Sequence, residues 1–128
     1  MKHIFLTTVL VIFSTLASVV NADIALKSKD EIQGTWKVDE TKNSLNDRRP
    51  FKREDTWVFE GDNLTILHIP REGTFYDQAP QPYDIEDGKI KVMMVGSSRF
   101  DLYTVVEKDD KHLVLKGKFG TYYYFSKK

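Results

Sequence analysis

The 128-residue chain contains no cysteine, and this absence excludes several kinds of chemistry. A chain without cysteine has no disulfide framework, no thiol nucleophile and no zinc–cysteine site. It also lacks the residue to which diacylglycerol is attached in exported lipoproteins, so that form of membrane anchoring is excluded as well. A single domain of this size folds without a disulfide, because roughly 65% of its unfolded surface is removed from water.

An excess of charge of either sign is also absent, since 19 basic residues balance 19 acidic residues. Proteins that bind nucleic acid nonspecifically present a basic surface to the phosphate backbone. The near-neutral composition argues against that class of function, and we expect no nucleic-acid partner.

Residue patterns typical of catalysis or metal binding are equally scarce. His68 and His112 are far apart in the sequence, and no metal-ligand spacing connects them. Met93 and Met94 are soft ligands suited to Cu(I), but neighbouring residues of a strand point to opposite faces. No serine lies in a nucleophile-elbow context, and no phosphate-binding loop is present. We expect a protein that is not an enzyme, with no catalytic residue, no metal and no cofactor.

A long apolar run occurs only at the N-terminus. Residues 1–22 begin with the basic residue Lys2, continue as an apolar run over residues 4–20 and end at Ala22, a residue type that signal peptidase accepts. This pattern predicts a secretory signal peptide, a mature domain over residues 23–128, and a location in the periplasm or outside the cell. The alternative is a retained anchor, but the run is marginal for spanning a bilayer. We expect no stable membrane anchor after cleavage.

The mature sequence is typical of short strands joined by turns. In residues 32–38, Ile32, Gly34 and Trp36 alternate with polar residues, and a period of two indicates a half-buried strand. Ser28, followed three residues later by Glu31, predicts one capped helical turn before this strand. The same alternation predicts about eight strands, near residues 32–38, 56–60, 64–69, 83–87, 89–94, 99–106, 112–116 and 121–126.

A meander of eight strands exposes two edges unless it closes on itself. We therefore predict an all-β fold, a small eight-stranded antiparallel up-and-down barrel. Such a barrel is wide enough to be filled by side chains or to hold one small ligand. The predicted interior is rich in large side chains and favours a mostly filled barrel with a shallow cup at one end; its members are Trp36, Trp57, Phe59, Tyr83, Met94, Phe100 and Phe125.

Gly34-Thr35-Trp36 in the first strand, the series of hairpins and the Tyr-rich last strand resemble the lipocalin-like domains of small exported bacterial proteins. The resemblance covers residues 32–126. More broadly, the sequence is similar to the lipocalin/calycin group, whose first strand carries Gly-x-Trp. It implies a barrel that binds a small apolar molecule, with Gly34 and Trp36 as the structural motif. It also implies an arginine or lysine over the motif tryptophan, for which Arg99 and Lys118 are the candidates.

The loop over residues 39–54 contains the only dense basic run, and loops of this length in compact domains are often functional. We predict that it covers the barrel mouth and that its cations meet an anionic head group, whereas the alternative is a solvated connector. The predicted ligand-binding residues at the mouth are Arg48, Arg49, Phe51, Lys52, Arg53, Trp57, Tyr76 and Tyr83.

Two classes of function follow from these patterns. The first is an exported binding module for a small apolar or amphipathic ligand, including an anionic amphipathic one. The alternative is a protein-interaction module, such as an inhibitor or accessory subunit, with a filled barrel and no ligand. The state of the barrel interior separates the two.

Overall fold

The computed structural model describes residues 23–94 and 96–128, so the predicted signal peptide lies outside the described residues. The fold is all-β, as predicted, and its one helical piece in this range is a short turn, η1 (Lys29–Glu31). The strands are β1 (Gly34–Lys42), β2 (Phe51–Lys52), β3 (Thr56–Glu60), β4 (Asn63–Leu67), β5 (Ile69–Arg71), β6 (Thr74–Tyr76), β7 (Gln81–Glu86), β8 (Lys89–Met93), β9 (Phe100–Lys108), β10 (His112–Gly117) and β11 (Tyr122–Lys127).

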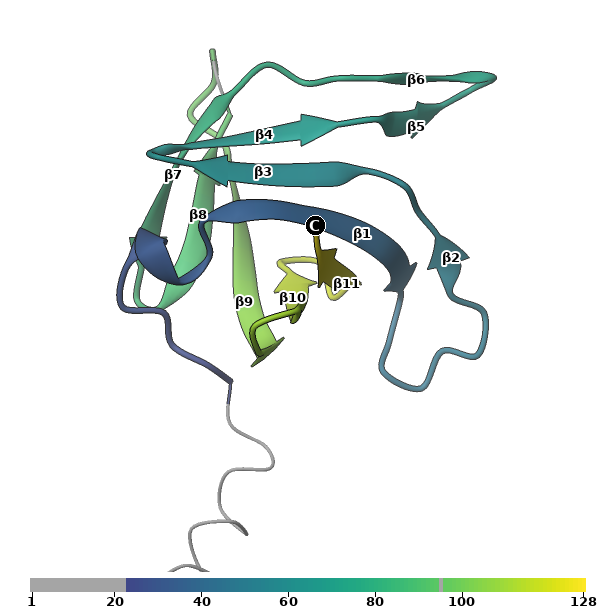
Figure 1. Ribbon diagram of the computed structural model, residues 1–128, viewed down its shortest axis with the longest axis horizontal. Helices are drawn as coiled ribbons and strands as arrows, with labels where there is room; N and C mark the ends of the chain where they lie inside the picture. The colour runs from purple at the N-terminus through teal and green to yellow at the C-terminus, as the bar shows by residue number, and fades with distance from the viewer. Residues whose placement is uncertain (1–22, 95) are drawn as a thin grey trace, which may run out of the picture.

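Eight of these strands form a closed antiparallel barrel, which confirms the predicted fold class (Figure 1). They follow one another around the barrel in chain order, β1, β3, β4, β7, β8, β9, β10 and β11, and β11 pairs with β1 to close it. Strand β2 adds to the far end of β1, and β5 and β6 form a separate hairpin. We call the end where β1, β4, β8 and β10 finish the mouth, and the opposite end the floor.

The floor half of the barrel is filled by large apolar side chains. Of the predicted interior, Trp36, Trp57, Phe59, Tyr83 and Phe125 are buried. The predictions for Met94 and Phe100 are wrong, because these side chains are 36% and 40% exposed. Met94 follows the last residue of β8 and Phe100 is the first residue of β9, so both stand at the mouth beyond the packed core.

The lead-in to the first strand closes the floor. The Ile24 amide donates to the Val105 carbonyl at 2.8 Å, and the Leu26 amide donates to the Gly88 carbonyl at 2.9 Å. Gly88 has φ +78, and a Cβ there would lie 2.7 Å from the Ala25 Cβ, so only glycine permits this contact. The predicted capped turn is present, with the Glu31 carboxylate accepting from the backbone amides before it.

The motif glycine and tryptophan are joined by a lysine from the last strand. Lys127 Nζ lies 4.6 Å from the centroid of the Trp36 ring and donates to the Gln33 carbonyl at 3.0 Å. Gly34 has φ +126, and a Cβ at this position would lie 2.8 Å from Lys127 Nζ. The glycine therefore serves two purposes: it adopts a backbone conformation that L-residues avoid, and it leaves room for the cation.

Neither Arg99 nor Lys118 occupies the place over the tryptophan, so that prediction is wrong. Arg99 lies in the β8–β9 loop and Lys118 follows β10, both at the mouth. Trp36 pairs with Lys127 across the β1–β11 ladder, which exists only because the barrel closes.

Candidate functional site

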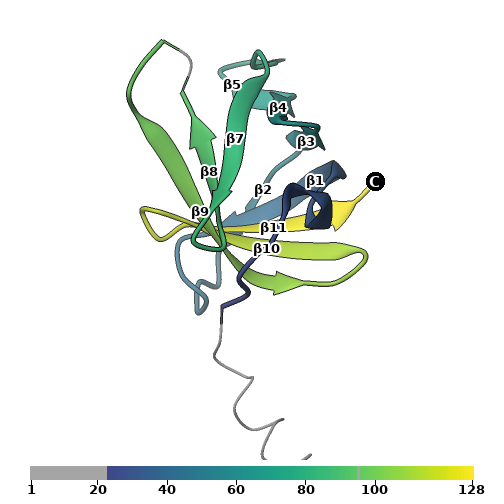
Figure 2. The same ribbon diagram turned by 90° about the vertical axis from the view of Figure 1, so that its left-hand side faces the viewer.

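The barrel wall opens between β4 and β7. These strands pair at only two positions, Asn63 with Pro82 and Leu64 with Gln81, whereas β3 and β4 pair at five. The Tyr83 amide also donates to the Asp62 carbonyl at 3.0 Å, and the regular ladder ends at Leu64. Beyond it the Gln78 amide donates to the Ile66 carbonyl at 2.8 Å, and in Figure 2 the β8–β9 loop stands apart from the start of β7 at the mouth.

A cavity of about 180 Å³ lies inside the mouth below this seam. Its wall combines aromatic, aliphatic and polar side chains from most of the barrel strands. The lining residues are Arg53, Asp55, Trp57, Leu64, Ile66, Ile69, Tyr76, Gln78, Gln81, Val92, Met94, Asp101, Tyr103 and Tyr123.

An aromatic cluster around Trp57 separates the cavity from the filled floor. The Trp57 ring meets Tyr103 and Phe125 edge-on, with centroids 5.2 Å and 5.0 Å away, and lies 5.6 Å from Tyr123. Edge-to-face contacts at these separations are favourable and fix ring orientation. The cavity therefore has a rigid aromatic base.

The Trp57 indole N–H is the unusual polar group of this wall. Nε1 is buried and has no hydrogen-bond partner among the described residues, whereas Trp36 Nε1 donates to the Ile32 carbonyl at 3.0 Å. Buried indole N–H groups normally find an acceptor, because leaving one unpaired costs about 1–3 kcal/mol. Trp57 therefore lines the cavity and holds, just beneath the wall surface, a donor that nothing in the described protein satisfies.

Two tyrosine hydroxyls share the wall with Trp57. Burial raises the pKa of Tyr103, and nearby Tyr123 and Asp101 act in the same direction. Burial also raises the pKa of Tyr123, and Arg53 opposes part of that effect. Both phenols therefore stay neutral at ordinary pH and keep their protons as hydrogen-bond donors.

The cation nearest the cavity is already committed to a carboxylate. Arg53 Nη2 and Nε donate to the two oxygens of Asp55 at 2.6 Å and 2.9 Å. The Asp55 residue is 2% exposed, and its backbone carbonyl accepts from the Val38 amide. A two-point pair of this kind neutralises both charges and stiffens the wall.

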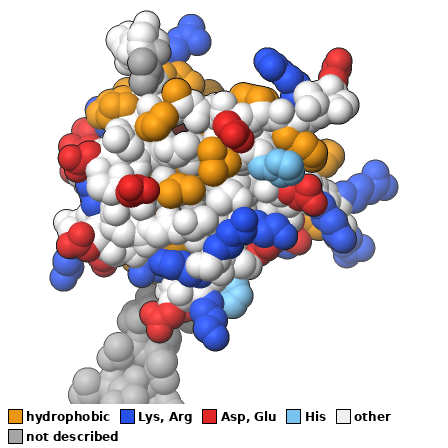
Figure 3. All heavy atoms as spheres, turned by 45° about the horizontal axis from the view of Figure 1, so that its top comes forward, with side chains coloured by type: hydrophobic (Ala, Val, Ile, Leu, Met, Phe, Trp, Pro, Cys, Tyr) orange, Lys and Arg blue, Asp and Glu red, His pale blue; other side chains and the backbone are white. Residues whose placement is uncertain are grey.

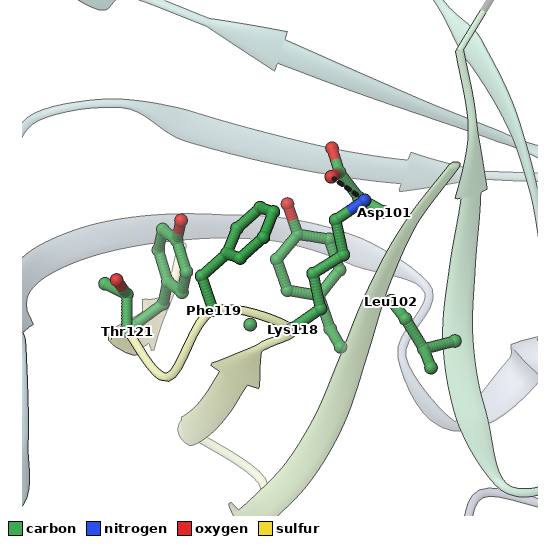
Figure 4. A pocket seen from close by; sticks show the side chains of 8 residues that line it. Asp101, Leu102, Lys118, Phe119 and Thr121 are labelled. Atoms are coloured by element: carbon green, nitrogen blue, oxygen red, sulfur yellow. Dashed lines mark ion pairs between the residues drawn. The ribbon is translucent and has the colours of Figure 1, made fainter. Parts of the chain in front are cut away.

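A smaller pocket of about 50 Å³ adjoins the cavity and shares Asp101, Tyr103 and Tyr123 with it. In Figure 4, Lys118 points toward Asp101 while Phe119 stands beside it on the β10–β11 turn. Lys118 Nζ lies 3.5 Å from Asp101 Oδ1 and donates to the Phe100 carbonyl at 2.6 Å. This lysine joins the β9 and β10 sides of the mouth.

Of the predicted ligand-binding residues, Arg53, Trp57 and Tyr76 line the cavity together. Tyr83 lies near the floor instead, where its hydroxyl accepts from Gln33 Nε2 at 2.7 Å. The remaining predicted residues are exposed on the β1–β3 connection and are not in the cavity wall; they are Arg48, Arg49, Phe51 and Lys52.

Sequence reasoning missed Tyr103, Tyr123, Asp55 and Asp101. In β9 the residues on both faces are partly apolar, so alternation alone does not choose the inward face. Placing Phe100 in the interior assigned the wrong face of β9 to the core. In the structure the other face, with Tyr103 and Val105, is buried. A bulge in β9 at Val106, opposite Val114 and Leu115 of β10, makes the pattern still harder to follow.

Within residues 23–94 and 96–128, no group of three or more His, Asp or Glu side chains is arranged to hold a metal ion. No helix in the same described part is long and apolar enough to cross a bilayer. No known protein family matches the chain, and neither a curated protein nor a solved structure is significantly similar to it. The closed eight-stranded barrel is compatible with a lipocalin-like fold, and the likeness rests on the architecture.

Proposed function

We propose that the protein is an exported binding module whose mouth cavity takes one small, mainly apolar molecule that carries a hydrogen-bond acceptor. The observation that carries the proposal is the cavity itself, which is lined by Trp57, Tyr103 and Tyr123 and adjoins a buried Trp57 N–H that has no partner among the described residues. Buried polar atoms are nearly always paired, and a ligand acceptor in the cavity supplies the missing partner. Convergent polar groups in an apolar concavity are typical of ligand sites.

The size of the cavity limits the ligand. An apolar cavity of about 150 Å³ holds a benzene molecule, whereas sites for drug-sized ligands occupy roughly 300–1,000 Å³. The volume of about 180 Å³ therefore suits a single substituted ring or a short branched chain. A long acyl chain does not fit without rearrangement of the wall.

The polar groups of the wall favour a neutral acceptor, such as a carbonyl or an ether. Tyr103 and Tyr123 are neutral donors because burial raises the pKa of each hydroxyl. The Arg53 cation is paired with Asp55, so a ligand carboxylate would compete with a buried carboxylate for it. This refines the prediction of an anionic head group toward a neutral one.

The test compares two near-isosteric probes, acetophenone and ethylbenzene, by calorimetry on the purified protein. The carbonyl of acetophenone offers an acceptor that ethylbenzene lacks, and we expect about tenfold tighter binding of the ketone, since one buried unpaired donor is worth at least ~1 kcal/mol. Trp57→Phe removes one of the donors and should reduce the difference, and Tyr103→Phe should reduce it further. Equal affinities for the wild type, or no binding of either probe, would contradict the proposal.

Export is the second part of the proposal, and it rests on the pattern of residues 1–22. The N-terminus of protein recovered from its own host should be at Asp23 or within a few residues of it. Intact Met1 on the soluble cytosolic protein would contradict export. The alternative function, a protein-interaction module with a filled barrel, gains less support because the mouth half retains a cavity.

A further inference from the structure

The exposed large hydrophobic side chains of the described residues all lie at the mouth. They project from separate segments that surround the cavity: the β1–β3 connection, the β5–β6 hairpin, the β8–β9 loop and the β10–β11 turn. We call them the rim; its members are Leu45, Phe51, Phe75, Tyr76, Met94, Phe100 and Phe119. Phe119 is the most prominent, at 90% exposed.

Cations accompany the rim aromatics. Lys118 Nζ lies 5.3 Å from the ring centroid of Phe119, and Lys91 Nζ lies 4.4 Å from that of Phe100. On the β5–β6 hairpin, the guanidinium of Arg71 lies 4.8 Å from the centroid of a third rim ring, that of Tyr76. Figure 3 shows one face of the molecule, with scattered hydrophobic patches and with both basic and acidic side chains between and around them. Aromatic rings beside basic groups are typical of surfaces that rest at a lipid headgroup layer.

The two ends of the barrel differ in charge. The mouth segments, residues 43–55, 68–80, 94–99 and 118–121, contain seven basic and five acidic residues. The floor segments, residues 23–33, 61–62, 87–88, 109–111 and 128, contain four basic and seven acidic residues. An anionic surface therefore attracts the mouth and repels the floor, which orients the barrel as it approaches.

We propose that the mouth docks on the surface of an anionic lipid bilayer. The rim side chains enter the boundary between headgroups and acyl chains, and the exposed cations of the β1–β3 connection, Arg48, Arg49 and Lys52, meet lipid phosphates. A bilayer accepts apolar tips that stand apart on four segments, whereas a protein partner needs a contiguous, well-packed core of contacts. The docking proposal depends on the rim and on the charge distribution, and it does not require a ligand in the cavity. If the cavity also binds a small apolar molecule, its opening then faces the membrane from which such a molecule partitions.

The test measures sedimentation of the purified protein with phosphatidylcholine vesicles, with and without phosphatidylglycerol, at low and high salt. We expect binding to the anionic vesicles at low salt and weaker binding at high salt, since surface charges are screened. Phe119→Ser should reduce vesicle affinity by about tenfold, the effect of losing most of one buried aromatic contact. Phe119→Trp should retain it, because a large interfacial aromatic is kept.

Charge variants at the two ends form a matched pair. Arg49 in the mouth loop and Lys111 in the floor turn are both exposed cations. Arg49→Glu should weaken binding to anionic vesicles severalfold, and Lys111→Glu should leave it unchanged. The docking proposal is overturned if the wild type does not bind anionic vesicles at low salt, or if Phe119→Ser and Arg49→Glu bind as well as the wild type. Binding of acetophenone is a separate readout, so failure of docking and failure of the cavity proposal are distinguishable.

Discussion

Gly34 illustrates how one residue determines a local arrangement at the floor. Its φ of +126 is unfavourable for any side chain, and a Cβ would displace Lys127 from Trp36. The residues of the motif were evident in the sequence. Their lysine partner was not, because Lys127 is adjacent to them only after the first and last strands pair.

We expect Gly34→Ala to lower the free energy of unfolding by about 2–3 kcal/mol, combining backbone strain with the displaced cation. Gly73→Ala is the matched control, since Gly73 also has positive φ but nothing lies within 4 Å of its added Cβ. It should cost about 1 kcal/mol from strain alone. Urea unfolding measures both. When Lys127 is already replaced by alanine, Gly34→Ala should lower the free energy of unfolding by less than it does in the wild type. The explanation is refuted if the two glycine substitutions are equally destabilising and the Lys127→Ala change does not alter the effect at Gly34.

The elements predicted best are those with regular alternation and clear turn residues. Strands β7 and β8 around Asp87-Gly88, and β9 to β11, lie close to their predicted positions. The run predicted as one strand over residues 64–69 is divided at His68, which has φ +59 and donates its amide to Asp77. Strands β2, β5 and β6 are two or three residues long, too short for a periodic signal.

Among the neighbouring strands of the barrel, β4 and β7 share the shortest ladder, with two paired positions. Amide hydrogen exchange should therefore be faster along this seam. The Ile66 carbonyl accepts from the Gln78 amide, so the backbone of Ile66 faces β7, where the ladder has already ended at Leu64. Thr65 and Leu67 face β3 and pair there. We expect the Ile66 amide to exchange at least tenfold faster than its two neighbours. Comparable protection of all three would mean that the seam is closed in solution.

At the scale of the whole molecule, the barrel is filled at the floor and open at the mouth. Part of the mouth site was predictable, because Trp57 lies in a strand with clear alternation and Arg53 lies in the basic loop before it. Tyr103 and Tyr123 line the same cavity because their faces of β9 and β11 point into the barrel. Both faces of these strands carry apolar residues, so the sequence does not show which face points inward. The floor plug formed by Ile24 and Leu26 likewise depends on contacts distant in sequence.

The buried tyrosines should make the fold sensitive to alkali. Burial raises the pKa of Tyr103 in the folded state above the value of about 10 in an unfolded chain. The folded state therefore holds this proton more tightly, and its contribution to stability is complete below about pH 10 and is lost as the pH rises further. Urea unfolding between about pH 8 and pH 11 should show falling stability, with a shallower fall for Tyr103→Phe. Identical slopes for the two proteins would place this hydroxyl in water.

The most direct test of the account uses the indole N–H signals of the two tryptophans in ¹⁵N-labelled protein. Trp57 lines the cavity, and its buried Nε1 has no partner among the described residues; Trp36 Nε1 donates to the Ile32 carbonyl and serves as an internal control. During titration with acetophenone, the Trp57 signal should move downfield and the Trp36 signal should stay in place, because only Trp57 gains an acceptor. Ethylbenzene should move the Trp57 signal much less. A Trp57 signal that does not respond to acetophenone, or two signals that shift equally, would contradict the assignment of the mouth cavity as the ligand site.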